Sequence, residues 1–242
     1  MLTNAWPLDI PSARAEPYDR GVTADLPASA AASYPARVER LALCELMSEL
    51  GPEAATMCDG WTTADLAAHL VVREHRPVAA AGITLRPLAG LTERARTKAR
   101  DRTSFAELLA RIRQGPPKWS IFGLPGMDKA LNTAEYFVHH EDVRRAQPGW
   151  EPRPADPVLD EQLWRRLRGA ARLIMRKVPA EVTVVRPDGK TLLLTKDGKR
   201  ARVHGPVGEL VLWVFGRTDV AQVRFTGEEG AITALTETRW GA

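Results

Sequence analysis

Apolar residues recur at helical spacing through the first two thirds of the chain. Over Pro35–Glu49 they predict a helix that ends before Gly51 and Pro52, two residues that stop helices. A helix with an apolar stripe buries one side. Five residues form the expected stripe: Val38, Leu41, Leu43, Leu46 and Leu50.

The start of the next helix is predicted by the residues of its first turn. Thr62 and Asp65 have the residue types and the spacing of a capping box, in which a hydroxyl and a carboxylate each accept from a free backbone amide. They predict a helix that runs to about Arg76. The pattern over residues 82–103 is weaker and predicts a loop with a short helix.

Two more helix starts follow. Ser104 and Glu107 repeat the capping pattern and predict a helix over 105–114, which a Gly-Pro-Pro sequence then stops. Asp128 can cap a longer helix, expected over 129–146.

After a last predicted helix over 157–177, the period changes from helical to strand-like. Turn sequences such as Pro187-Asp188-Gly189-Lys190 separate short β-branched segments. We therefore place a domain boundary near residue 178, between a helical part over 34–178 and a small α/β domain over 179–242, in an α+β protein. The α/β domain is expected to hold strands over 181–186, 191–196, 200–203, 220–225 and 231–236, and a helix over 207–215.

Residues 1–33 are rich in Ala, Pro, Ser and Asp without a sustained period, which predicts a disordered leader. The whole chain is 44% hydrophobic and 26% charged, as in ordinary globular proteins. No apolar run approaches the ~18–20 residues that a membrane helix needs. The N-terminus also lacks the basic-then-apolar pattern of a signal peptide. We expect a cytoplasmic protein with no membrane partner.

The net charge is +4, and the excess is weak for a nucleic-acid-binding protein. A solvated face of an amphipathic helix explains the basic stripe on the helix over 157–177 better than nucleic-acid binding does, because the stripe has no interleaved aromatic residues. We expect no nucleic-acid partner. The stripe consists of Arg165, Arg168, Arg172 and Arg176.

Chemistry-bearing side chains concentrate on the helix over 129–146. Glu135 and His139 are four residues apart, so they share a helix face with Cβ atoms ~5–6 Å apart and can hold one ion together. His69 lies among apolar residues on an earlier helix, which directs its imidazole inward. Facing helices that project Glu and His inward are one way to build a metal site in a bundle.

These residues also have structural interpretations. Glu135 and His139, with the polar residues after them, fit a hydrogen-bonded solvated helix face, and His69 fits a core histidine. Asp142 fits equally a carboxylate that orients a ligand histidine and a surface acid. His140 points about 100° away from His139 on the helix, so we do not expect it to bind the same ion.

The two cysteines, Cys44 and Cys58, fit no disulfide framework and no zinc motif. We expect both to be reduced and mostly buried. A catalytic role for Cys58 is an alternative that no nearby residue pattern supports.

Three motifs follow one another along the chain: Gly60–Leu70 (GWTTADLAAHL), the spacing Glu135-x-x-x-His139-x-x-Asp142, and Val203–Pro206 (VHGP) with a later Gly216-Arg217 pair. In this order they resemble the mycothiol-dependent maleylpyruvate isomerase family, a branch of the DinB-like metalloenzymes. The resemblance covers about residues 35–242 and is closest to a metal-binding subfamily rather than to the isomerase itself.

The resemblance implies a DinB-like four-helix bundle, followed by a small α/β domain, with one metal held by His69, Glu135 and His139. It also implies mycothiol, a low-molecular-weight thiol, as cofactor, and thiol addition to a small electrophilic substrate. An arginine of the C-terminal domain is implicated in the isomerase, and Arg217 is the nearest candidate for a catalytic residue here.

Three protein ligands leave an open position on an ion, as in catalytic sites. A thiol that enters it would lose its proton, and the thiolate could attack an electrophilic carbon. Addition followed by elimination isomerises a double bond, whereas addition alone is an S-transfer. Zinc fits two imidazoles and a carboxylate best, although nickel, iron and manganese accept them too. The alternative function is a non-catalytic metal-binding accessory protein.

The leader gives a first prediction. Removal of residues 1–33 should leave the melting temperature and metal binding nearly unchanged, because this stretch lacks the apolar periodicity needed to join a core. Thermal melts of the full and shortened chains measure this. A large fall in melting temperature would show that the leader packs against the rest of the protein.

Overall fold

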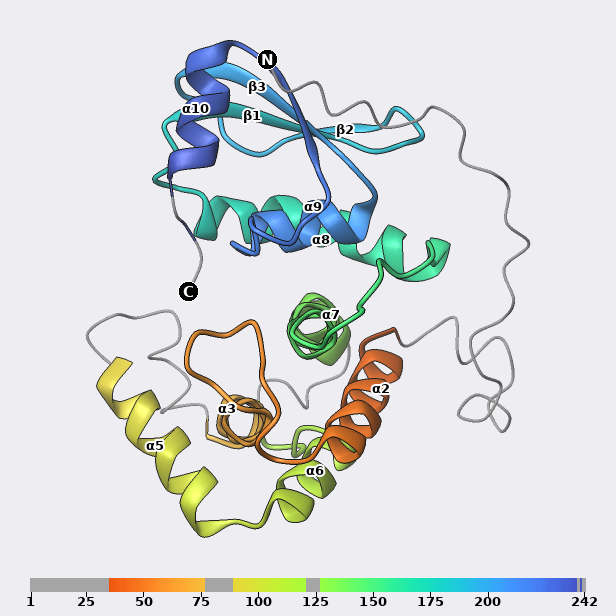
Figure 1. Ribbon diagram of the computed structural model, residues 1–242, viewed down its shortest axis with the longest axis vertical. Coiled ribbons are helices and arrows are strands. Elements are labelled where there is room, and N and C mark those ends of the chain that lie inside the picture. Colours follow the sequence, from red (N-terminus) through yellow and green to blue (C-terminus); the bar gives the residue numbers. More distant parts are fainter. Residues whose placement is uncertain (1–34, 77–88, 121–126, 239, 241–242) are drawn as a thin grey trace.

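The computed structural model describes residues 35–76, 89–120, 127–238 and 240, so the predicted leader lies outside the described residues. Within them the chain forms eight helices and one four-stranded sheet, an α+β architecture. Figure 1 shows the sheet above a layer of two helices, with the remaining large helices below. No helix in the described ranges is long and apolar enough to cross a membrane.

Four helices contribute side chains to the core of the N-terminal part: α2 (Pro35–Leu50), α3 (Thr63–His75), α6 (Phe105–Gln114) and α7 (Met127–Arg145). Leu43, Leu66, Leu108 and Tyr136, one from each helix, are fully buried in this core or nearly so. A further helix, α5 (Ala89–Arg102), packs on the outside of α3.

Two of the three predicted N-caps are present. Thr62 and Asp65 form the complete capping box at the start of α3, and Ser104 accepts from the backbone amide of Glu107 at the start of α6. Asp65 has a second function, because it also accepts from Arg96 and Arg100 of α5. The 14-residue helix α5 replaces the short helix that we expected, and its charged side chains explain why no apolar period revealed it.

The predicted stripe of α2 is wrong in part. Val38 and Leu50 are 40% and 36% exposed, and the buried face instead includes Glu39 and Arg40. Burial of these charges is possible because each has a partner of opposite charge elsewhere in the protein. The face predicted from hydropathy alone therefore differs from the face of α2 that is buried.

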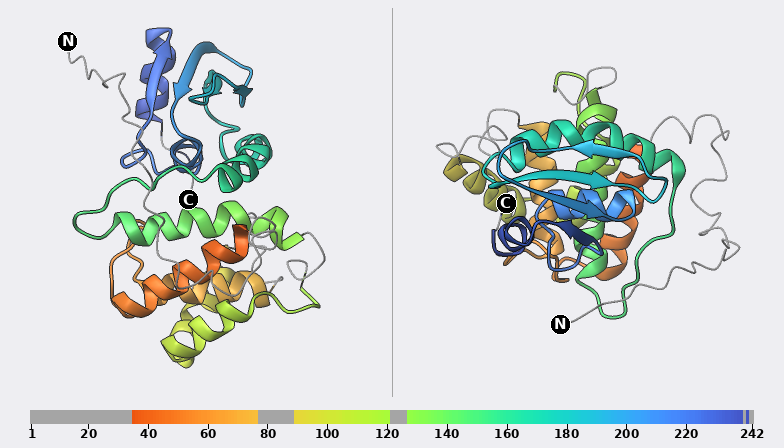
Figure 2. Two further views of the ribbon diagram at one scale, coloured as in Figure 1. Left: turned by 90° about the vertical axis from the view of Figure 1, so that its right-hand side faces the viewer. Right: turned by 90° about the horizontal axis from the view of Figure 1, so that it is seen from above.

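Helix α7 starts earlier than predicted, at Met127, so Asp128 lies inside its first turn and does not precede the helix. Figure 2 (left) shows α7 lying between the other N-terminal helices and the chain from residue 157 onward, which we call the C-terminal part. It is thus the element that both parts share.

The sheet contains β1 (Ala180–Val185), β2 (Thr191–Leu193), β3 (Lys199–His204) and β4 (Arg224–Gly227), in the order β2-β1-β3-β4. The central strands β1 and β3 are parallel, with Val184 opposite Val203, and both outer pairs are antiparallel. Helices α8 (Pro157–Ile174) and α9 (Val207–Val214) share one core with the buried residues of β1 and β3. The core thus joins α8 to the sheet, although α8 precedes residue 178.

Two predicted strands differ from the structure. Residues 231–236 belong to α10 (Glu229–Glu237), in which Ala231 and Leu235 are buried at helical spacing while their β-branched neighbours are not. Of the predicted strand over 220–225, only the end enters β4. The backbone of Val220 and Gln222 is hydrogen-bonded by the side chains of Arg145 and Glu209 instead of by another strand.

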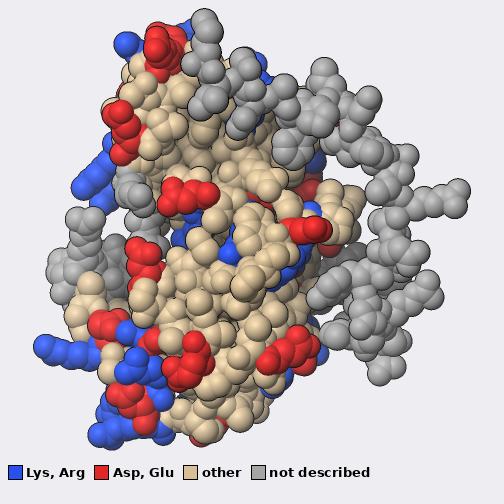
Figure 3. Space-filling model, viewed as in Figure 1, with Lys and Arg blue, Asp and Glu red and all other residues tan. Residues whose placement is uncertain are grey.

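The basic stripe of α8 and the residues after it is exposed, as a solvated helix face should be. Arg165 pairs with Glu161 at 3.0 Å, one helical turn earlier. On the face shown in Figure 3, basic and acidic residues are interspersed.

The first turn of α8 makes the stability of the fold depend on pH. Burial and the neighbouring N-cap Asp156 raise the pKa of Asp160 from 3.8 to about 6. The folded state therefore binds more protons than the unfolded state between these values, and stability falls as the pH rises through this window. Asp160→Asn should stabilise the protein at pH 7 by about 1 kcal/mol, allowing for solvent screening, and have little effect near pH 4.

Urea denaturation of both proteins at the two pH values measures this difference. Glu49→Gln, at an exposed position of α2, is the control and should change stability little at either pH. An equal effect of Asp160→Asn at pH 4 and pH 7 would contradict the assignment.

Candidate metal centre

The three predicted ligands meet between α3 and α7. Oε1 of Glu135 lies 3.5 Å from Nε2 of His69 and 3.4 Å from Nε2 of His139. The donor atoms of all three residues lie within 4.8 Å of one another. The ring centroids of the two histidines are 5.4 Å apart. The structure therefore brings together the set of residues that the sequence proposed.

Core packing explains why these side chains converge. On α3, Leu66 and Leu70 are fully buried on either side of His69. On α7, Tyr136 and Val143 are buried in the same core, and Oε1 of Glu135 lies 3.5 Å from His69 on α3. Because Glu135 and His139 are one turn apart, both reach the contact between the two helices.

Asp142 orients His139. Its Oδ2 lies 2.9 Å from Nδ1 of His139, so the ring donates its Nδ1 proton to the carboxylate and turns Nε2 toward Glu135. The side chain of Asp142 is completely buried. Of the two interpretations of Asp142, the structure thus supports the orienting carboxylate and excludes the surface acid.

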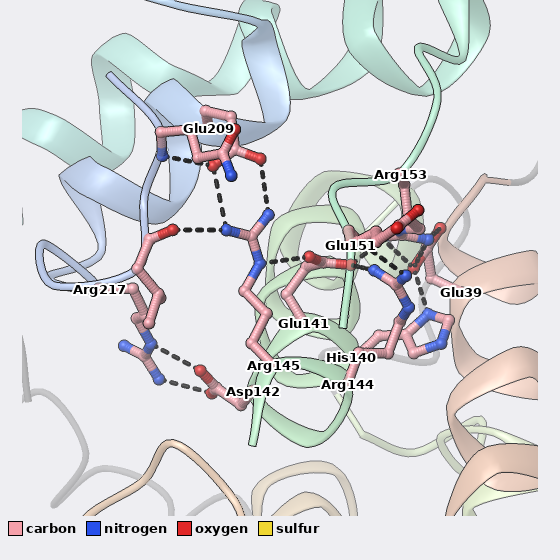
Figure 4. A network of polar contacts seen from close by, with 12 residues as sticks. Glu39, His140, Glu141, Asp142, Arg144, Arg145, Glu151, Arg153, Glu209 and Arg217 are labelled. Atoms are coloured by element: carbon pink, nitrogen blue, oxygen red, sulfur yellow. Dashed lines mark hydrogen bonds and ion pairs between the residues drawn. The ribbon is translucent and has the colours of Figure 1, made fainter. Parts of the chain in front are cut away.

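Arg217 holds Asp142 from the other side. Its Nε and Nη2 donate to the two carboxylate oxygens of Asp142 at 2.9 and 2.7 Å, as Figure 4 shows. Its Nη1 donates to the carbonyl of Phe215 at 2.7 Å. Arg217 therefore reaches the site from the C-terminal part, and these contacts are those of a residue that acts through Asp142.

The loop before α3 brings a thiol into the site. Sγ of Cys58 donates to Oδ2 of Asp142 at 3.3 Å and lies 4.0 Å from Nδ1 of His139. Both cysteines are free, as expected, but Cys58 is only partly buried, whereas Cys44 is fully buried. No residue pattern near Cys58 in the sequence indicated these contacts, because its neighbours in space lie about 80 residues away in sequence.

Two further residues of the site, Trp61 and Arg73, were not among the residues predicted from the sequence. The indole of Trp61 packs on the ring of His69 with centroids 5.2 Å apart. Nε of Arg73 lies 3.1 Å from Oε1 of Glu135. A signal for Arg73 was present, since it follows His69 by four residues and therefore lies on the same face of α3.

The surroundings set the charges of the ligands. Burial alone would raise the pKa of Glu135, but Arg73 and the two imidazoles outweigh it and hold this pKa well below its ordinary value. Burial lowers the pKa of His69 and keeps that imidazole neutral. Burial also opposes the charged form of His139, yet hydrogen bonds to Asp142, Cys58 and Glu135 raise its pKa, so a cation at Nε2 competes with a proton.

These residues fit a divalent metal. Two imidazole Nε2 atoms and one ionised carboxylate are the donor types that zinc prefers, and the contact between Asp142 and His139 is the usual support of a ligand histidine. A second group, Cys58 with His139 and Asp142, is less suited to a cation because Arg217 already pairs with both oxygens of Asp142.

His140 faces away from these residues, as predicted. Its Nδ1 lies 2.9 Å from Glu39 of α2, in a buried contact.

Neither a family model nor a curated protein sequence matches the chain. Two solved structures resemble it. One is the crystal structure of the mycothiol-dependent maleylpyruvate isomerase, with 16% sequence identity and a TM-score of 0.49. The other is a variant of that isomerase with one histidine replaced by alanine, with 16% identity and a TM-score of 0.51. Each match covers 85% of this chain and 95% of the other. At this identity the similarity shows that the fold is shared.

Proposed function

We propose that this protein binds one divalent metal ion through His69, Glu135 and His139 and uses it to activate a low-molecular-weight thiol, mycothiol, for isomerisation or S-transfer. The observation that carries the proposal is the convergence of these three donors, one of them oriented by Asp142. The shared fold with a mycothiol-dependent isomerase supports the choice of thiol.

The charges around the site favour an anionic ligand. Glu135 and Asp142 carry two negative charges, and Arg73 and Arg217, which contact them directly, carry two positive charges. With neutral imidazoles, a bound divalent cation would therefore give the site an excess of positive charge. Such an excess stabilises a thiolate relative to a thiol.

The metal would supply the acid strength that lowers the pKa of a thiol bound to it. The protein would supply orientation. Asp142 fixes the ring of His139, and Arg217 keeps Asp142 ionised and in place. Arg73 holds the carboxylate of Glu135, while Trp61 covers one side of the His69 ring.

We propose a small substrate with an electrophilic carbon. In an isomerisation the thiolate adds to one carbon of a double bond, rotation follows about the resulting single bond, and elimination returns the thiol. In an S-transfer the new carbon–sulfur bond remains, and the neighbouring carbon takes up a proton in place of the electron pair of the double bond. Neither reaction consumes a protein cysteine.

We further propose that α2, α3, α6 and α7 form a bundle of the DinB-like type, since these four helices share one core. Zinc is our proposal for the metal, because its preferred donors match the three ligands. A non-catalytic metal-binding protein is the second candidate. The burial of both imidazoles, each 9% exposed, favours it, because structural metal sites are closed.

Metal content tests the ligand set. Protein that is loaded with zinc and then dialysed without chelator should hold about one ion per chain. His69→Ala and His139→Ala should each lose most of it, because two remaining ligands bind weakly. Elemental analysis measures the ratio. As a control, His75→Ala removes a half-buried histidine of α3, the helix of His69, and should keep the metal. Full zinc content in both ligand variants would refute the site.

Mycothiol binding tests the thiol. Zinc-loaded protein should bind mycothiol, release a proton and melt at a higher temperature as the mycothiol concentration rises. Metal-free protein and Glu135→Ala should show little proton release and little rise in melting temperature, because the cation is what stabilises the thiolate. Calorimetry in two buffers of different ionisation enthalpy counts the released protons.

The S-methyl derivative of mycothiol is the matched control. It keeps the rest of the molecule but has no acidic proton, so it should bind more weakly and release none. Equal binding of mycothiol to metal-free and metal-loaded protein would show that the metal does not activate the thiol. Metal binding without any mycothiol binding would favour the non-catalytic function.

A further inference from the structure

Two arginine–carboxylate pairs cross the contact between α7 and the C-terminal part in opposite directions. Arg145 of α7 reaches Glu209 of α9, and Arg217, which follows α9, reaches back to Asp142 of α7 (Figure 4). The second pair belongs to the candidate metal centre. The first lies three residues further along α7 and contacts none of the proposed ligands in the described part of the chain.

Arg145 binds four acceptors. Its Nε donates to Glu141 at 2.6 Å, and its Nη1 and Nη2 donate to the two oxygens of Glu209 at 3.1 and 2.6 Å. Nη1 also donates to the carbonyl of Val220 at 2.8 Å. One guanidinium thus holds both α9 and the chain segment after it.

Glu209 holds the same segment a second time. Its Oε2 accepts from the backbone amide of Gln222 at 2.8 Å. The loop over residues 216–222 therefore carries Arg217 near its start, and its last residues bind the Arg145–Glu209 pair. Since Val220 and Gln222 lie outside the strands, these two side chains replace the strand partners that their backbone groups lack.

The pair is buried, with side chains of Arg145 and Glu209 only 2% and 7% exposed. A buried guanidinium that loses its partner is strongly destabilised, so it moves or draws in water. Either change would disturb the carbonyl of Val220 and, through the short loop, Arg217. The position of Arg217 in turn determines the support of Asp142 under His139.

We propose that Arg145 and Glu209 are positioning residues of the metal centre. They hold the loop over 216–222 so that Arg217 stays paired with Asp142 and His139 keeps its orientation. This proposal rests on the proposed function in so far as the centre binds metal.

A double-mutant cycle tests the proposal. Glu209→Gln removes the charge and keeps the size, and Arg217→Met removes the guanidinium. Zinc affinity is measured by competition with a chelator for the original protein, both single variants and the double variant. Loss of support for a ligand histidine typically weakens metal binding 10–100-fold. We expect each single variant to bind zinc about 10-fold more weakly, and the double variant no more weakly than Arg217→Met alone.

Two outcomes of this cycle would overturn the proposal. One is unchanged zinc affinity in Glu209→Gln. The other is a full additional loss in the double variant, which would show that Glu209 acts on the metal independently of Arg217. Glu161→Gln is the matched control. It replaces a partly exposed carboxylate of α8 that pairs with Arg165 and Arg186 and with none of the residues of the candidate centre in the described chain, and should leave zinc affinity unchanged.

Hydrogen exchange of the metal-free protein separates this proposal from the proposed function. In Glu209→Gln, peptides that contain residues 216–223 should exchange faster, while peptides from α2 and β1 should not change. Unchanged exchange in the loop would contradict the positioning function even where zinc binds. An original protein that binds no zinc would instead contradict the proposed metal site, and faster exchange would then still show that Glu209 holds the loop.

Discussion

Helix α7 carries more charge into the interior than a buried helix can normally accept, and the structure depends on a partner for each of these charges. Glu135, Glu141, Asp142 and Arg145 all lie on it, and the last three are almost completely buried. A single buried charge without a partner would cost about 3–5 kcal/mol. The segments that pack around α7 are therefore those that bring the matching charges.

This requirement connects distant parts of the chain. Glu141 accepts from Arg144 and Arg145 on its own helix and from Arg153 in the segment before α8, and Arg153 also pairs with Glu39 of α2. The ionic contacts thus run from α2 through α7 to α9, as Figure 4 shows. Dispersion and apolar burial hold each core together. The ion pairs fix the position of the N-terminal and C-terminal parts relative to α7, because their hydrogen-bond geometry tolerates little displacement.

Local features could be predicted from the sequence because their causes are local. The capping box of Thr62 and Asp65 and the shared face of Glu135 and His139 depend on spacings of three and four residues. The α+β class followed from the change of period near residue 178. Where the local signal was ambiguous it misled, as in α10, whose β-branched residues suggested a strand although its buried residues recur every four positions.

The surroundings of the candidate metal centre could not be predicted in this way. Cys58 and Arg217 reach Asp142 from sequence distances of 84 and 75 residues, and nothing near either residue indicates this contact. The sequence could have indicated only that an acid on a buried helix face needs a positively charged partner, and not which residue that partner is.

The same reasoning explains why the candidate centre lies where the two parts meet. The three proposed ligands come from α3 and α7, so the N-terminal helices alone contain the donor set. The orientation of His139 also requires Asp142, whose carboxylate is buried and ionised. The guanidinium that pairs with this carboxylate comes from the C-terminal part. The hydrogen bond to His139 and the contact with Arg217 both lower the pKa of Asp142 against the effect of burial, so loss of the guanidinium would raise this pKa and weaken the carboxylate as the acceptor for Nδ1 of His139. The C-terminal part thus supplies a charge partner to a candidate site whose proposed ligands all come from the N-terminal helices. In the structure, the C-terminal part carries the arginine that pairs with Asp142 of α7.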